Sequence, residues 1–499
     1  MRLGSIRKTE ARNWPDGKAR FFTVLFISLC LLLPQAGFAA WSSNPIVVAG
    51  DSEEQRRPQV VYDGAGGYYV SWQENNGNGM FAQHYNAAGN ATWNAPVQLS
   101  NTTDSSLQQE STADGSGGLL VAWNEYDGKD DYIQVQRVNV NGTIAWAAGG
   151  VQVINAGEPW IAADGTGGAI VMSYNGRFVN RVAADGSLPW GDADNAISFS
   201  SSSSATKIAP DGAGGAILLW REYSAFDGVA VQRIDSDGNF VWNSGDPLQI
   251  SSDGGSYSCP RLIPQEGGAI VAWYENGVVR AQKIDGDGEI QWTANAEAVA
   301  TGQSPNILGL ASDGAGGAFI AWENSGLVRA QYIDTDGQVV WDDPVDMSTD
   351  TNLDDIPQHP AFIIPDGQGG FITTWSTDDQ EIRAQRSNAS GDLLWTATGA
   401  LLATGTDIYY GPKLTSNGLG GAVMVWVDDE DDTGTNIMMQ GVSASGVAGD
   451  PGFDEEEECR SSDGWCFVGS LGAFQATPSA GMVWLCIAGL IGIVTGRKR

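Results

Sequence analysis

The sequence predicts an all-β protein, an eight-bladed β-propeller built from repeats of about 51 residues. Two patterns carry this prediction. A glycine-rich turn, Asp-Gly-x-Gly-Gly, recurs before short apolar stretches that end in Trp, and a second Gly precedes a Trp by four residues in seven copies. The repeated span also lacks the 3.6-residue period of a helix. A unit of this length with about four strands is typical of a propeller blade, and the alternative is an open tandem array of small β-units.

The first half of each repeat is the glycine-rich turn followed by a strand. The first copy runs from Asp63 to Trp72 and the second from Asp114 to Trp123. The turns of the later copies lie at Asp164, Asp211, Glu266, Asp313, Asp366 and Asn417. Such turns between Val, Ile and Trp runs indicate hairpins, because Gly adopts positive φ without steric cost. In the third copy we expect Tyr174 to replace the Trp.

The second half of each repeat contains a turn, which follows a stretch with a Gln in most copies and precedes a Trp in seven copies. The pairs are Gly89/Trp93, Gly142/Trp146, Gly186/Trp190, Gly238/Trp242, Gly288/Trp292, Gly337/Trp341 and Gly391/Trp395. An indole buries a large area and can hold the register of a blade. We therefore interpret these Trp residues, together with Trp41, as structural blade-docking residues; the alternative is a ring that stacks on carbohydrate.

The ends of the repeat region predict a closed ring. The eighth copy has its turn at Ser445 and Gly446, but position 450 is Asp and not Trp. Conversely, the stretch that begins at Trp41 resembles the stretch after Trp93. We expect residues 41–50 to supply the last strand of the eighth blade, with residues 47–48 beside residues 438–443. This pairing removes an open sheet edge.

The repeat resembles two groups of proteins. The pattern Ala-Gln-x-Ile-Asp-x-Asp-Gly-x-x-x-Trp is similar to the tryptophan-docking repeats of eight-bladed quinoprotein-like (PQQ-like) propellers, in which a Gly-x-x-x-Trp unit locks neighbouring blades. The stretch from Gly288 to Trp292 has this spacing, whereas the upstream Ala and Asp are out of register by one residue. The adjacent Cys pair of quinone-dependent dehydrogenases is absent, since the Cys residues are at 30, 259, 459, 466 and 486. The resemblance implies the architecture and no cofactor. The chain is also similar to tandem Asp-Gly-x-Gly-Gly repeat proteins of bacterial envelopes.

Both ends of the chain are predicted to be targeting segments. Residues 1–40 combine a basic start, an apolar run of thirteen residues and a small-residue exit, which is typical of a cleaved signal peptide. Residues 451–478 form an acidic spacer, and residues 479–499 are predicted to form a transmembrane helix with a basic tail that stays in the cytoplasm. This end resembles the sorting tails of bacterial surface proteins. Cys459 and Cys466 in the spacer either form a disulfide or serve as a processing or lipid site.

The charge of the chain excludes some classes of partner. Sixty acidic residues against 26 basic ones give a net charge of −34. Nucleic acids and anionic membrane surfaces attract clusters of Lys and Arg, so neither is an expected electrostatic partner. Only two His residues, His84 and His359, are available for metal or triad chemistry.

Candidate chemistry is confined to acidic turns. Asp-x-Asp-Gly turns could place carboxylates around Ca²⁺, while the alternative is a hairpin turn stabilised by the Asp side chain. The candidate calcium ligands are Asp235, Asp237, Asp285, Asp287, Asp334 and Asp336. Periodic arginines at positions 280, 329 and 383 are interpreted as partners of strand-face salt bridges and not as a catalytic triad.

The predicted function is binding or scaffolding. We expect an exported β-propeller that is anchored in a bacterial envelope by its C-terminal helix. We expect a monomer whose loops recognise an envelope protein or a polysaccharide. The alternative is an enzyme that acts on extracellular polysaccharide through carboxylates in the central channel. A glycosidase needs two positioned carboxylates, and with so many acidic residues the sequence does not select a pair.

Overall fold

The computed structural model describes residues 41–452, except residues 51–53, 75–78, 101–107, 175–176, 201, 253, 256, 294–295, 303–307, 325, 349–361, 378, 405–411 and 430–433. The predicted signal peptide, the spacer beyond Gly452, Cys459, Cys466 and the predicted transmembrane segment 479–499 therefore lie outside the described residues. Within the described part of the chain, no helix has the length and apolar character that crossing a bilayer requires.

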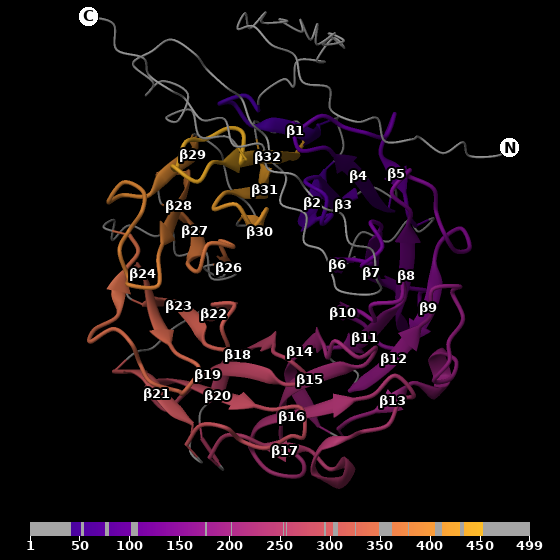
Figure 1. Cartoon of the computed structure of the whole chain (residues 1–499). Coiled ribbons are helices and arrows are strands. Elements are labelled where there is room, and N and C mark those ends of the chain that lie inside the picture. Colours follow the sequence, from indigo (N-terminus) through magenta and orange to yellow (C-terminus); the bar gives the residue numbers. More distant parts are fainter. Residues whose placement is uncertain are drawn as a thin grey trace, which may run out of the picture.

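The predicted eight-bladed β-propeller is confirmed. Eight antiparallel sheets of four strands each are arranged around a central axis, and Figure 1 shows the first strand of each blade nearest that axis. The innermost strands of blades one to eight are β2 (Gln55–Tyr62), β6 (Gln109–Ala113), β10 (Pro159–Ala163), β14 (Ser203–Pro210), β18 (Tyr257–Pro264), β22 (Leu308–Ser312), β26 (Phe362–Pro365) and β30 (Lys413–Ser416). Each of these strands contacts the innermost strand of both neighbouring blades, including β2 with β30 across the start and end of the ring.

The remaining strands follow outward in chain order, except that β1 is the outermost strand of the eighth blade. The second strands are β3 (Tyr68–Glu74), β7 (Leu119–Tyr126), β11 (Ala169–Ser173), β15 (Ala216–Glu222), β19 (Ala269–Glu275), β23 (Ala318–Asn324), β27 (Phe371–Thr377) and β31 (Ala422–Asp428). The third strands are β4 (Gly79–Tyr85), β8 (Asp131–Val138), β12 (Phe178–Val182), β16 (Gly228–Ile234), β20 (Val278–Ile284), β24 (Leu327–Ile333), β28 (Glu381–Ser387) and β32 (Asn436–Val442). The outermost strands are β5 (Val97–Gln98), β9 (Val151–Ile154), β13 (Ile197–Ser198), β17 (Leu248–Gln249), β21 (Glu297–Thr301), β25 (Val345–Asp346), β29 (Ala400–Thr404) and β1 (Ile46–Ala49). Two short 3₁₀ turns, η1 (Ala193–Asn195) and η2 (Trp242–Gly245), precede outermost strands.

The eighth blade is closed by the N-terminal strand. β1 pairs antiparallel with β32, with Ile46 opposite Met439 and Val47 opposite Met438. Figure 1 shows this indigo strand beside the orange-yellow strands of the last blade. The side-chain amide of Gln440 donates a hydrogen bond of 3.0 Å to the carbonyl oxygen of Ser43, so the two ends of the ring are joined by side-chain as well as backbone contacts.

The hydrophobic core lies between the blades. The second strands are almost entirely buried, as their continuous apolar runs indicated. The two faces of each second strand pack against the two neighbouring blades. One cluster, for example, joins Ile217 and Leu219 of the fourth blade to Val271 and Trp273 of the fifth. In the third blade the position of this Trp is taken by Ser173 and not by the expected Tyr174, because Ser173 lies nine residues after Asp164, as Trp72 does after Asp63.

Candidate functional site

The eight predicted docking tryptophans make one repeated contact between blades. Each indole Nε1 donates a hydrogen bond of 2.7–3.2 Å to a backbone carbonyl oxygen in the turn of the next blade. The pairs are Trp41 with Ala87, Trp93 with Val140, Trp146 with Ala184, Trp190 with Ser236, Trp242 with Gly286, Trp292 with Thr335, Trp341 with Ala389 and Trp395 with Ala444. These tryptophans join blades and do not line the central cavity described below.

The invariant Gly of the same turn packs against this indole. A Cβ on Gly446 would come within 2.6 Å of the Trp395 ring, and one on Gly288 within 2.6 Å of the Trp242 ring. The atoms nearest to the added Cβ therefore belong to the Trp of the preceding blade. A close approach of the ring to the backbone and a positive φ both require Gly here.

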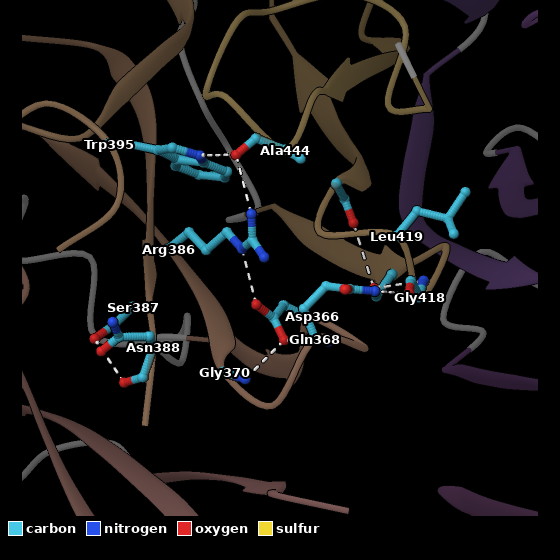
Figure 2. A network of polar contacts seen from close by, with 12 residues as sticks. Asp366, Gln368, Gly370, Arg386, Ser387, Asn388, Trp395, Gly418, Leu419 and Ala444 are labelled. Atoms are coloured by element: carbon cyan, nitrogen blue, oxygen red, sulfur yellow. Dashed lines mark hydrogen bonds and ion pairs between the residues drawn. The ribbon is translucent and has the colours of Figure 1, made fainter. Parts of the chain in front are cut away.

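The Asp of the glycine-rich turn has two roles. In the seventh blade, Asp366 Oδ1 accepts hydrogen bonds from the backbone amides of Gln368 and Gly370, and its Oδ2 accepts one of 2.8 Å from Arg386 Nε. Arg386 also donates to the carbonyl oxygen of Ala444, the acceptor of the Trp395 indole (Figure 2). Similar pairs are made by the residue after the Gln, or after Asn180 in the third blade: His84–Asp63, Arg137–Asp114, Arg181–Asp164, Arg233–Asp211 and Tyr332–Asp313.

The predicted calcium ligands lie in exposed or half-exposed turns. Asp235 Oδ1 accepts hydrogen bonds from the backbone amides of Asp237 and Asn239, and these contacts, opposed by burial, lower the pKa of Asp235. Asp285 and Asp334 make equivalent contacts, whereas the Asp two residues later contributes its backbone amide to each turn. Among the described residues, no group of three or more His, Cys, Asp and Glu side chains could hold a metal ion.

The periodic arginines occupy the strand faces. Arg280 pairs with Glu275 at 3.1 Å, Arg329 with Asp346 at 2.8 Å, and Arg383 with Glu381 at 2.7 Å. These ion pairs are separate contacts within three different blades.

The central channel has a ring of residues that differ from blade to blade. The second strand of every blade except the third carries an inner Trp, such as Trp72 in the first blade, and Ser173 takes its position in the third blade. In each blade, one residue of the innermost strand pairs with the residue directly before this position. The occupants of this ring, from the first blade to the eighth, are Gln59, Glu110, Trp160, Lys207, Arg261, Gly309, Phe362 and Lys413. The ring residues of seven blades line a cavity of about 310 Å³, and Leu308, Leu310, Ile363 and Leu414 provide part of an apolar wall.

The charged side chains of this ring act on one another across the channel. Burial raises the pKa of Glu110, and the charges of Lys413 and Lys207 oppose this change. Burial also lowers the pKa of Lys413; Glu110 opposes that effect and Arg261 adds to it. Lys207 Nζ lies 3.0 Å from the centre of the Trp160 ring, in a cation–π contact. The four charged groups come from the second, fourth, fifth and eighth blades, so only closure of the ring brings them together.

The sequence analysis did not identify this ring, although the sequence contains a signal for it. Its members lie thirteen residues before the inner Trp position, as Gln59 does before Trp72 and Glu110 before Trp123. Arg261 lies twelve residues before Trp273, because the turn of the fifth blade is one residue shorter. Residues that stabilise the fold, such as the docking Trp and the turn Gly, are the same type in successive repeats. The ring position, in contrast, has a different side chain in almost every blade. Variation at one fixed position of a repeat is thus the available signal.

The protein is thus an eight-bladed β-propeller with a cavity at its central axis that is large enough for a small molecule. We call this cavity, lined by the innermost strands, the hub cavity. No model of a known protein family matches the sequence, and no curated protein does. Among solved structures, the chain is similar to a putative 6-phosphogluconolactonase from Bacteroides fragilis, with 14% identity over 79% of this chain and 99% of that one and a TM-score of 0.35. It is also similar to the BP39L lectin from Burkholderia pseudomallei, with 15% identity over 67% and 97% of the two chains and a TM-score of 0.42. These similarities are too low to carry an argument about function.

Proposed function

We propose that this protein is a binding propeller whose ligand site is the hub cavity. The observation that supports the proposal is the ring from Gln59 to Lys413, where side chains vary between blades while the docking Trp and the turn Gly recur. Ligand sites in proteins are concave and mostly apolar, with a few convergent polar groups. The hub cavity has this composition, because leucines and an isoleucine form a wall beside four charged side chains.

The alternative predicted function, a polysaccharide-active enzyme, finds less support. A glycosidase uses two carboxylates that flank the scissile bond. Among the described residues that line the cavity, Glu110 is the one carboxylate, and three cations accompany it. A scaffolding role toward an envelope protein or polysaccharide would use the loops at the blade ends, and it is compatible with a ligand at the hub.

The proposal also includes export and anchoring. Residues 1–40 would direct the chain out of the cytoplasm, and residues 479–499 would hold it in the cytoplasmic membrane. The similarity to envelope repeat proteins and to sorting tails supports this location. The similarity to quinoprotein-like propellers enters as architecture only, and the proposal includes no cofactor.

A thermal-shift screen of the full-length protein in detergent tests the binding function. Small molecules and oligosaccharides are compared on the wild type and on Gly309→Phe, which fills the cavity with the residue that the seventh blade has at this position. We expect at least one compound class to raise the melting temperature of the wild type, since a ligand of the native state stabilises it. We expect this shift to disappear in Gly309→Phe and to persist in Lys129→Phe, at an exposed loop. A shift that persists in Gly309→Phe would contradict a hub site, and the absence of any ligand would contradict the function.

Cell fractionation tests the anchoring. Deletion of residues 479–499 is expected to move the protein from the membrane fraction to the soluble exported fraction. Full-length protein that is soluble with an intact C-terminus by mass spectrometry would contradict the anchor. Replacing Cys459 and Cys466 by Ser tests the processing or lipid role: altered processing of the tail supports it, and an unchanged tail contradicts it and supports a plain anchor.

A further inference from the structure

We propose that the hub cavity binds a small organic anion with an apolar body. This inference rests on the proposed binding function and names its ligand class. It is carried by the side chains that converge on the cavity: Lys207, Arg261 and Lys413 provide three positive charges, and Glu110 provides one negative charge.

The excess of positive charge is local. The whole chain has a net charge of −34, yet the described lining of its hub has two more cations than carboxylates. Like charges held together in a partly buried cavity raise the free energy of the folded state, and an anion placed between them lowers it. Arg261 opposes the protonation of Lys413 from across the channel, which is the interaction that a bound anion would relieve.

The fold does not require charges at these positions. The sixth blade has Gly309 at the same register, and the seventh has Phe362. Blades with a small or an apolar residue at the ring still form four strands with the same pairing pattern. The four-stranded pairing of a blade therefore does not depend on a charged residue at this register.

The shape of the cavity restricts the ligand further. Its volume of about 310 Å³ is at the lower end of the range for small-molecule pockets and excludes a folded partner. The planar guanidinium of Arg261 suits two oxygens of a carboxylate or phosphate, while the ammonium groups of Lys207 and Lys413 act as point charges. On the sixth to eighth blades, Leu310 and Leu414 offer an apolar surface to the rest of the molecule.

Isothermal titration calorimetry on the full-length protein tests the ligand class with four probes. They are phthalate, phenyl phosphate, inorganic phosphate and the uncharged phthalamide. We expect phthalate or phenyl phosphate to bind, and the stronger of the two identifies a carboxylate or a phosphate as the preferred anionic group. Inorganic phosphate should bind at least tenfold more weakly than the stronger aromatic anion, because it lacks the apolar body. Phthalamide should not bind.

Two variants with opposite expected effects test whether the ring residues bind the anion. Lys413→Met keeps the length of the side chain and removes one charge, and it should weaken binding of the aromatic anion at least tenfold. Glu110→Gln removes the opposing carboxylate and should strengthen binding several-fold. Lys129→Met, at an exposed loop, should change neither. The unliganded melting temperature of each variant shows whether it is folded, and Glu110→Gln keeps the proposal testable if Lys413→Met fails to fold.

Several results would overturn the proposal. They are no binding of any anion by the wild type, equal binding of phthalamide, inorganic phosphate binding as tightly as the aromatic anions, or weaker binding by Glu110→Gln. The screen could instead find a neutral ligand that stabilises the wild type and not Gly309→Phe. That result would support the hub as a binding site and contradict the proposal that its ligand is an anion. The two failures are therefore distinguishable.

Discussion

The indole Nε1 of Trp395 donates a hydrogen bond of 2.9 Å to the carbonyl oxygen of Ala444 in the next blade. Arg386 Nη1 donates to the same oxygen at 3.1 Å while its Nε binds Asp366 (Figure 2). One backbone carbonyl thus receives a neutral and a charged donor from the preceding blade. Trp190 and Arg181 donate to the carbonyl oxygen of Ser236 in the same way, so this contact recurs between blades.

The ion pair of Arg386 and Asp366 provides the first prediction. The Asp366 side chain is 1% exposed, so Arg386→Met leaves a buried carboxylate without its cation and should destabilise the protein by about 3 kcal/mol. Arg386→Tyr should cost about 1 kcal/mol, because a hydroxyl can replace one hydrogen bond of the guanidinium. The sixth blade shows such a pair, with Tyr332 Oη donating to Asp313 at 2.9 Å. Urea denaturation midpoints measure the order, and equal midpoints for the two variants would contradict it.

The contact between Gly446 and Trp395 leads to the second prediction. Gly446→Ala introduces a Cβ 2.6 Å from the ring at a φ of +86° and should cost about 3 kcal/mol from crowding and backbone strain together. Gly64→Ala is the matched control, because φ is +79° there and no atom lies within 4 Å of the added Cβ. It should cost about 1 kcal/mol from strain alone. Similar losses of melting temperature in both variants would show that the Trp contact contributes nothing.

Ring closure by β1 gives the third prediction. Deletion of residues 41–50 exposes the edge of β32 and removes Trp41, so the melting temperature should fall and the protein should aggregate. Two point variants on adjacent residues refine the test. Ile46→Lys should cost about 2 kcal/mol because Ile46 is partly buried against the core, whereas Val47→Lys should cost less than about 0.5 kcal/mol because Val47 is 56% exposed. An unchanged melting temperature after the deletion would contradict closure.

The turn carboxylates predict a dependence of stability on pH. Burial opposes ionisation of Asp164, but hydrogen bonds from Thr166, Gly168 and Arg181 outweigh it and lower its pKa from the ordinary 3.8. A lowered pKa in the folded state means that ionised Asp164 contributes stability above pH 3.8 and loses this contribution as the pH falls through the lowered value. The stability difference between the wild type and Asp164→Asn should thus be constant near neutral pH and shrink in acid.

The control for this experiment is an exposed turn residue. Asp237→Asn changes an exposed side chain and should alter stability little at any pH. Chemical denaturation between pH 7 and pH 2 measures both differences. A wild-type advantage over Asp164→Asn that grows in acid would have the wrong sign and would contradict the assignment.

The repeat, the all-β class, the number of blades and the pairing of the N-terminal strand with the last blade could all be predicted from the sequence. The reason is that these features depend on local chemistry that each repeat carries: glycines at positive φ, continuous apolar strands and an indole at constant spacing. The missing Trp at position 450 and the additional Trp41 were readable for the same reason, since a defect in a regular pattern is visible without coordinates.

Contacts between residues of different blades could not be predicted from the sequence and became visible in the folded ring. Spacing relates Gly446 to its own blade, yet the ring that it contacts belongs to Trp395, and that contact exists because adjacent blades pack face to face. The hub is the stronger case, because Glu110, Lys207, Arg261 and Lys413 are separated by up to 303 residues in the chain and meet only when eight inner strands surround one axis. Electrostatic interaction depends on distance in space, which a repeat pattern does not specify until the ring closes.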